Sequence, residues 1–240
     1  MDIMNGQAHR TLTIKRCLIY DFSMLIKQYQ PLLIIIPVIC ALLDFRGAGS
    51  IYKYTVAFTC GAILCLAYGK DITKDIWIVV IAFMFSIAGG WFLSNRRGLE
   101  IRFIYGIICY FIAHLGFLCF AIKNGQINKW VLCVTLIVYL TFFLTMLYKN
   151  INSKPLTLAV LCYLLISCIS FAAATGLNFH PLPKWLFAAG IFSLLFSDTL
   201  IAFKEFLNYD KLYSFLMMPT YYLSHILITL GLLINMVRGK

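Results

Sequence analysis

The chain has 240 residues, of which 62% are hydrophobic and 12% are charged, and its formal net charge is +11. Soluble domains contain roughly 45–50% apolar residues, so this composition excludes an ordinary soluble protein and indicates an integral membrane protein. The basic residues lie in short connections between apolar runs. This pattern argues against nucleic-acid binding and is typical of charge that flanks a membrane and meets anionic lipid headgroups.

Residues 1–30 are predicted to form an N-terminal interfacial tail. They lack the uninterrupted apolar core and the small-residue cleavage site of a signal peptide. We expect an interfacial or partly helical segment with its apolar face on lipid.

Residues 31–240 are predicted to form a single all-α domain, a polytopic membrane protein with about eight transmembrane helices. Crossing a hydrocarbon layer of about 30 Å takes about 20 residues. The first two apolar runs are short, and tilt, a kink at Pro37 or local thinning of the bilayer could accommodate them. The expected spans are 31–45, 54–69, 76–94, 103–122, 130–148, 156–177, 185–203 and 213–236.

The orientation of these spans follows from the basic residues of the connections. With eight spans both termini lie on one side of the membrane, and that side collects 11 Lys and Arg against 9 on the other. The positive-inside rule then favours a cytoplasmic N-terminus in a cell (inner) membrane. The sequence does not give the oligomeric state.

Ionisable side chains inside the spans are the first candidates for function. Asp198 is the only acidic residue well inside a predicted span, and His114 and His225 are the two histidines that lie within spans. A charged side chain at a helix centre costs roughly 2.5–3.5 kcal/mol, so an intramembrane acid indicates a functional site. The alternative for Asp198 and His114 is a packing hydrogen bond between helices.

Depth in the membrane indicates which of these side chains can meet. Odd-numbered spans end, and even-numbered spans begin, on the same face, which places Asp198, Tyr221 and Tyr110 at similar depths. Spacing of i, i+4 puts Tyr221 with His225, and Tyr110 with His114, on common helix faces. We therefore expect spans 3, 4, 7 and 8 to enclose one polar pocket that contains Asp198 and opens to one side.

The same side carries three arginines, Arg96, Arg97 and Arg102, in the connection after span 3. Guanidinium groups beside such a pocket would suit the phosphate of a lipid headgroup. The alternative is simple membrane-flanking charge. The nine cysteines are scattered without a Cys-x-x-Cys pair, and no metal or other cofactor is predicted.

Several short motifs then resemble one known family. "GIFSLLFSDTLIAFKEF" followed by "MMPTYYLSHILI" resembles the C-terminal signature of the lysoplasmalogenase (YhhN-like) family, in which a Ser-Asp pair in the seventh span precedes a Tyr-Tyr pair in the eighth. "FSIAGGWFLSN" and "FIYGIICYFIAHLGFLCF" are similar to the third and fourth spans of the family, and "QPLLIIIP" more loosely to the start of its first span.

The resemblance implies an eight-span enzyme that hydrolyses the vinyl ether bond of a lysoplasmalogen to a fatty aldehyde and a glycerophospho-alcohol. Asp198 would be the acid or the charge stabiliser, and Tyr221 or Tyr222 would orient it. An alternative for the two tyrosines is aromatic packing near Pro219. The substrate would be a lysoplasmalogen or another lysophospholipid drawn from the membrane lipids, in contact with residues that include Ser197, Tyr110 and Gly90.

Two positions depart from the family pattern. The family has Gly-Asp where this chain has Gly89 and Gly90, and it has glutamine where this chain has His225. His114 or His225 would then supply the second acid or base. The departures leave open a second hypothesis, a non-catalytic lipid-binding or lipid-sensing relative. A third, a small-solute or proton-coupled transporter, is opposed by the lack of a convincing inverted repeat.

Overall fold

The computed structural model describes residues 30–46, 52–68, 74–151, 153–207 and 210–238, and within them the regular secondary structure is helical, apart from one isolated bridge between Gly125 and Leu177. This confirms the all-α class. The helices are η1 (Gln30–Ile34), α2 (Ile35–Phe45), α3 (Tyr52–Tyr68), α4 (Lys74–Ser94), α5 (Glu100–Lys123), α6 (Lys129–Phe142), the π-helix η3 (Phe143–Leu147), the short 3-10 turn η4 (Tyr148–Asn150), α7 (Lys154–Thr175), α8 (Pro181–Leu207) and α9 (Asp210–Arg238).

Six of the described helices are long and apolar enough to cross a membrane. They are Asp75–Ser94, Glu100–Lys123, Lys129–Asn150, Lys154–Thr175, Pro181–Leu207 and Phe215–Arg238. The protein is therefore a multi-pass membrane protein. The first two predicted spans correspond to shorter apolar helices, Pro31–Phe45 and Lys53–Tyr68, so a count of eight spans stays a prediction. The predicted tail of residues 1–30 lies outside the described residues, apart from its last residue, and the side of the N-terminus stays a prediction.

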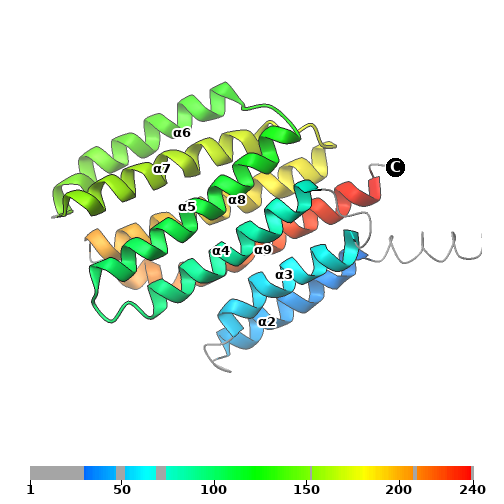
Figure 1. Ribbon diagram of the computed structural model, residues 1–240, viewed down its shortest axis with the longest axis horizontal. Coiled ribbons are helices and arrows are strands. Elements are labelled where there is room, and N and C mark those ends of the chain that lie inside the picture. Colours follow the sequence, from blue (N-terminus) through cyan, green and yellow to red (C-terminus); the bar gives the residue numbers. More distant parts are fainter. Residues whose placement is uncertain (1–29, 47–51, 69–73, 152, 208–209, 239–240) are drawn as a thin grey trace, which may run out of the picture.

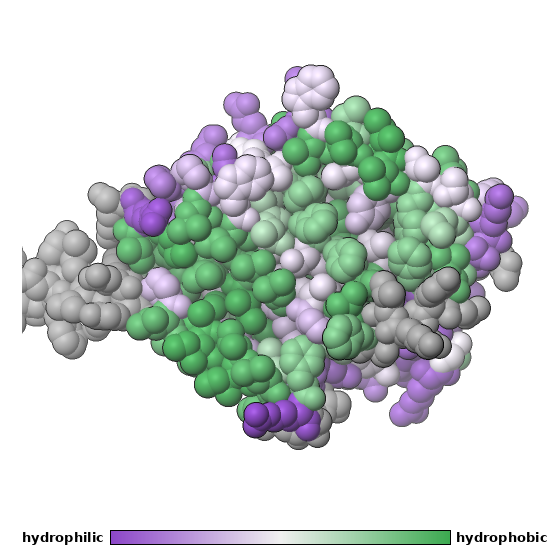
Figure 2. All heavy atoms as spheres, turned by 180° about the vertical axis from the view of Figure 1, so that it is seen from behind, coloured by the Kyte–Doolittle hydropathy of each residue, from purple (hydrophilic) through white to green (hydrophobic). Residues whose placement is uncertain are grey.

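The helices lie alongside one another in one bundle (Figure 1). Helices α2 and α3 form one edge, α6 forms the other, and α4, α5, α7, α8 and α9 lie between them, with extensive contact between α8 and α9 and between α4 and α5. Helix α6 has no buried residue, as expected for a helix at the edge of the bundle that presents much of its surface to lipid. Figure 2 shows hydrophobic side chains over the middle of one face and hydrophilic ones towards its edges, which fits a surface in a bilayer.

Local sequence signals account for several helix ends. The Asn128 side chain accepts hydrogen bonds from the backbone N–H groups of Trp130 and Val131, so it caps the start of α6. Arg97 and Gly98 both have positive φ, +48° and +76°, in the turn between α4 and α5, where glycine adopts such a φ without strain. Pro155 occupies the first turn of α7, where a missing N–H costs nothing.

The close contact between α8 and α9 depends on Gly190. A Cβ atom at this position would lie 2.7 Å from Ile228 Cγ1 and 2.8 Å from the carbonyl oxygen of Ser224, closer than a side chain tolerates. Glycine therefore lets the two helix backbones approach, as small residues do in membrane bundles. The contact fixes the height of α8 against α9, and with it the positions of Ser197 and Asp198 two turns further on.

Candidate functional site

Asp198 on α8 lies between two donors from neighbouring helices. The Tyr163 hydroxyl on α7 donates a hydrogen bond to Asp198 Oδ2, and His114 Nε2 on α5 lies 3.3 Å from the same oxygen. The Asp198 side chain is only 7% exposed and the His114 side chain is fully buried. Two donors thus offset the cost of placing a carboxylate inside an apolar bundle.

The protonation of His114 follows from its surroundings. Its Nδ1 atom is buried without a hydrogen-bond partner in the described structure, whereas Nε2 faces the Asp198 carboxylate. A proton on Nδ1 would be a buried, unpaired donor, so the arrangement fits the tautomer with its proton on Nε2. His114 then donates to Asp198, and both contacts to the carboxylate use Oδ2. The other carboxylate oxygen, Oδ1, is the one left for a substrate.

Two apolar cavities meet at Asp198. One, of about 390 Å³, lies among α4, α5, α7 and α8, and the other, of about 340 Å³, lies among α6, η3, α7 and α8. Val160, Tyr163, Asp198 and Ala202 line both of them. Because the other lining residues are mostly aliphatic or aromatic, either cavity suits an alkyl chain whose polar end reaches the carboxylate.

A second polar cluster joins α4 to α9. His225 is fully buried, its Nδ1 lies 2.9 Å from the carbonyl oxygen of Tyr221, and its Nε2 lies 3.1 Å from Ser86 Oγ. Ser86 Oγ also lies 3.1 Å from the Tyr221 hydroxyl. A carbonyl only accepts, so Nδ1 carries the proton, Ser86 donates to Nε2, and the Tyr221 hydroxyl donates to Ser86. The cluster is therefore a chain of hydrogen bonds with one consistent direction.

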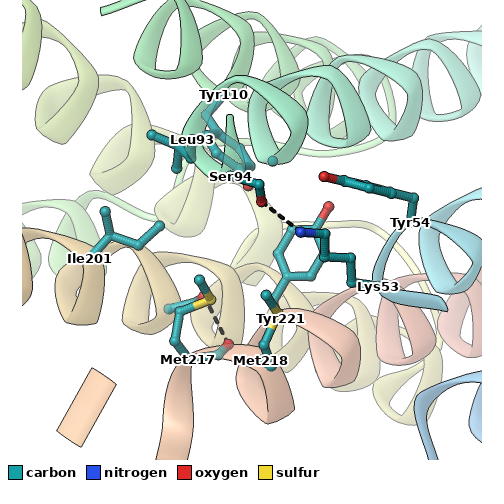
Figure 3. A pocket seen from close by; sticks show the side chains of 11 residues that line it. Lys53, Tyr54, Leu93, Ser94, Tyr110, Ile201, Met217, Met218 and Tyr221 are labelled. Carbon is teal, nitrogen blue, oxygen red and sulfur yellow. Dashed lines mark hydrogen bonds between the residues drawn. The ribbon is translucent and has the colours of Figure 1, made fainter. Parts of the chain in front are cut away.

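The Tyr221 end of this chain lines a third cavity, of about 490 Å³, among α3, α4, α5, α8 and α9. Figure 3 shows its side chains, with the ammonium group of Lys53 turned towards Ser94. The distance from Lys53 Nζ to Ser94 Oγ is 2.9 Å. Leu93, Tyr110 and Ile201 line both this cavity and the 390 Å³ cavity that contains Asp198, so the two adjoin.

Comparison with known families covers this whole region. The sequence profile of the YhhN family matches residues 52–232, which include both polar clusters and all three cavities. The chain belongs to the YhhN family. This family is the lysoplasmalogenase family, as the motifs indicated. No curated protein and no solved structure matches the chain.

The prediction of one polar pocket in this YhhN protein is wrong. Ser197 lines the 490 Å³ cavity beside Tyr221, whereas the next residue, Asp198, turns towards Tyr163 and His114. Successive residues of an α-helix point about 100° apart, so the Ser-Asp pair serves two sides of α8. The single site expected from depth is thus divided into two adjoining sites.

The Tyr-Tyr pair does not hold Asp198 in the way we expected. The Tyr221 hydroxyl pairs with Ser86, and the Tyr222 hydroxyl donates to Asp44 Oδ2 on α2 at 2.6 Å. Tyr163 donates to Asp198 instead. Tyr163 lies in the predicted span 156–177, which is outside the four spans that we expected to enclose the pocket.

Gly90 and Tyr110 of the YhhN protein both line the 490 Å³ cavity, together with Ser197. A Cβ atom at position 90 would lie 3.3 Å from the Tyr110 hydroxyl, so the aspartate that the family has here would enter this cavity. Ser86 and Ser94, one turn to either side of Gly90, bond to Tyr221 and Lys53 respectively. Ser86, Gly90 and Ser94 therefore lie on the side of α4 that faces Tyr221 and this cavity.

The three arginines have different surroundings. Arg96 forms an ion pair with Glu205 and lies over the ring of Phe103, 5.4 Å from its centroid. Arg102 donates to the carbonyl oxygen of Asn95 at 2.6 Å, and Arg97 is exposed in the turn. Their role in headgroup binding stays a prediction. Within the described segments, no group of three His, Cys, Asp or Glu side chains could hold a metal ion.

Proposed function

We propose that this YhhN protein is a membrane-embedded hydrolase that cleaves the vinyl ether bond of lysoplasmalogens. Membership of the lysoplasmalogenase family supports the reaction class. The observation that carries the proposal is the Asp198 carboxyl group, which receives two donors on Oδ2 and faces two apolar cavities. A carboxyl group kept inside a bundle at this cost is a functional group by default.

The geometry supports a reaction in which one carboxyl group acts first as acid and then as base. Protonated on Oδ1, Asp198 gives its proton to the β-carbon of the vinyl ether, and the adjacent carbon bonded to the ether oxygen becomes an oxocarbenium centre. The resulting carboxylate stabilises this cation and takes a proton from the water that attacks it. Asp198 then gives the proton it took from water to the departing glycerol oxygen and takes the hydroxyl proton of the hemiacetal, so the carbon–oxygen bond breaks, the aldehyde and the glycerophospho-alcohol leave, and the carboxyl group ends protonated as it began.

Tyr163 and His114 are positioning residues in this scheme. Both donate to Oδ2, so they hold the carboxyl plane fixed while Oδ1 exchanges protons with the substrate and water. Neither needs to change its own charge. This differs from the assignment suggested by the resemblance, in which a second acid or base replaces the aspartate that the family has at position 90.

The adjoining cavities suggest how the substrate lies. An alkenyl chain in the apolar 390 Å³ cavity and a polar headgroup in the 490 Å³ cavity would bring the ether bond near Tyr110 and Asp198. Tyr110 is buried and lines both cavities, so it lies at the boundary that such a lipid would cross.

A second candidate function is a lipid-binding relative without catalysis. Gly90 in place of the aspartate favours it, because the cavity is present but lacks that carboxylate. Both candidates bind the same lipid, but only the hydrolase releases an aldehyde from it.

The experiment is an assay of the purified protein against three lysolipids of equal chain length with a vinyl ether, a saturated ether or an ester at the same position. The proposal predicts aldehyde from the vinyl ether alone. In heavy water, trapped aldehyde should carry one deuterium on the carbon next to the carbonyl, because that carbon receives the proton. Binding of all three lipids without any aldehyde would reject hydrolysis and support the lipid-binding candidate.

A further inference from the structure

Lys53 is the one charged side chain among the described residues that line the 490 Å³ cavity. Its ammonium group donates to the hydroxyl of Ser94 and lies 4.9 Å from the centroid of the Tyr54 ring, and both partners are neutral. Elsewhere in the described structure, Arg96 pairs with Glu205 and Lys123 with Asp75. Lys53 thus brings a positive charge to the cavity that no described carboxylate neutralises.

The lining of the cavity favours an anion over a cation. The hydroxyl groups of Tyr54 and Ser94 line the same space, and no described lining residue is acidic. Hydroxyl and ammonium groups together supply several hydrogen-bond donors to one ligand, and a donor that carries charge forms the stronger bond. Met217 and Met218 complete the wall and provide an apolar border on the α9 side.

The position of Lys53 in the bundle matches the polar end of a lipid. It lies in the first turn of α3, beside the end of α4, where Ser94 is the last helical residue. The helix ends place it near one membrane surface, while Tyr110 and Ile201 connect its cavity to the one that holds Asp198. Lys53, near the membrane surface, suits the phosphate of a lysolipid, and Asp198, further from the helix ends, suits its ether bond.

We propose that Lys53 and the hydroxyl groups around it bind the phosphate of a lysophospholipid, which makes this cavity the headgroup site. The proposal rests on the proposed function for the identity of the lipid, but it concerns binding and needs no turnover. It assigns the phosphate to Lys53 rather than to Arg96, which already has a carboxylate partner.

The test measures binding of two saturated ether lipids, which the protein does not hydrolyse, to the purified protein in nanodiscs of zwitterionic lipid. One is 1-O-hexadecylglycerophosphoethanolamine, and the other is 1-O-hexadecylglycerol, which lacks the phosphate. Lys53→Gln should weaken binding of the phospholipid about tenfold and leave binding of the second lipid unchanged. Lys53→Arg should stay within about threefold of the parent protein because it keeps the charge.

Lys149→Gln is the matched control, since Lys149 is an exposed lysine in η4 and does not line the cavity. It should leave both affinities unchanged. No effect of Lys53→Gln, or an equal effect of Lys149→Gln, would overturn the proposal. Binding of inorganic phosphate or glycerophosphoethanolamine as tight as that of the lipid would also overturn it, because it would indicate a simple anion site.

These results are distinguishable from a failure of the proposed function. Phospholipid binding that depends on Lys53, without aldehyde release, would reject hydrolysis and keep the headgroup site. Aldehyde release that is unaffected by Lys53→Gln at substrate concentrations below saturation would keep hydrolysis and reject the headgroup site.

Discussion

Tyr163→Phe isolates the role of the hydroxyl group that holds Asp198. The substitution removes one oxygen atom and leaves the ring, which packs against His114 with a centroid distance of 5.5 Å. Asp198 then keeps His114 as its donor, and its side chain stays nearly buried at 7% exposure. The fold should therefore survive, and the effect should fall on the orientation of the carboxyl group.

The expected magnitude follows from the type of bond lost. A hydrogen bond to a charged group contributes about 1.5–3 kcal/mol. If the carboxylate that forms after proton transfer needs this bond, the barrier rises by that amount and aldehyde release slows by about tenfold to a hundredfold. The reduction should appear in kcat, with KM changed less, because the bond acts on the carboxyl group and not on the lipid.

Tyr139→Phe is the matched control for this substitution. Tyr139 lines the 340 Å³ cavity with Tyr163, but its hydroxyl lies 3.1 Å from Thr199 Oγ1 instead of bonding to Asp198. The assay follows aldehyde formation from one lysoplasmalogen by the parent protein and both variants. Unchanged kcat in Tyr163→Phe, or an equal loss in Tyr139→Phe, would refute the positioning role of Tyr163.

Two further predictions concern the second cluster and the missing aspartate. His225→Leu leaves the Ser86 hydroxyl proton without its acceptor and removes one of two side-chain donors to the Tyr221 carbonyl oxygen, which keeps Ser224. It should therefore destabilise the protein by about 1–3 kcal/mol, whereas His225→Gln should cost less because the amide replaces both bonds. Thermal unfolding in detergent measures the difference, and equal midpoints would contradict it. In Gly90→Asp the Tyr110 hydroxyl must move by a few tenths of an ångström, because the added Cβ would lie 3.3 Å from it, whereas the contact with Tyr54 at 3.8 Å is ordinary. The folded variant should raise aldehyde release at least about threefold if a second carboxylate assists. An equal or lower rate in the folded variant would show that Asp198 acts without it.

The helices followed from the sequence because apolar runs of sufficient length dominate it. The predicted span 103–122 corresponds to Glu100–Lys123, and 76–94 corresponds to Lys74–Ser94. The span 130–148 did not reveal the π-helix at Phe143–Leu147, because hydropathy is insensitive to a change from one helical hydrogen-bond pattern to another. The two short helices show where length alone does not decide whether a segment crosses the bilayer.

The sequence predicted how deep in the membrane the site residues lie, but not which helices are neighbours. Depth matched Asp198 with Tyr110, the i, i+4 spacing put His114 on the same helix face as Tyr110, and the structure places His114 Nε2 3.3 Å from Asp198 Oδ2. The same argument applied to span 156–177 would have found Tyr163, which lies about seven residues from the start of that span, as Tyr110 does in its own. Depth cannot tell which helices are neighbours, so it could not separate the surroundings of Asp198 from those of Tyr221.

The proposed headgroup site could not be predicted from the sequence for a different reason. Lys53 stands at the start of the second apolar run, where a lysine ordinarily marks a membrane boundary. Its significance depends on the hydroxyl group of Ser94, 41 residues away in the chain and on another helix. Only the packing of α3 against α4 brings the two together, and this packing cannot be read from hydrophobicity.

The central claim is that Asp198 performs the chemistry, and Asp198→Asn tests it most directly. Asparagine keeps the shape of the side chain and an oxygen that accepts from Tyr163 and His114, but it has no proton to transfer. The measurement is aldehyde release from lysoplasmalogen by the parent and variant proteins at equal folded concentration. The account predicts release by the parent and at least about a thousandfold less by the folded variant. Release by the variant at the parental rate would contradict it.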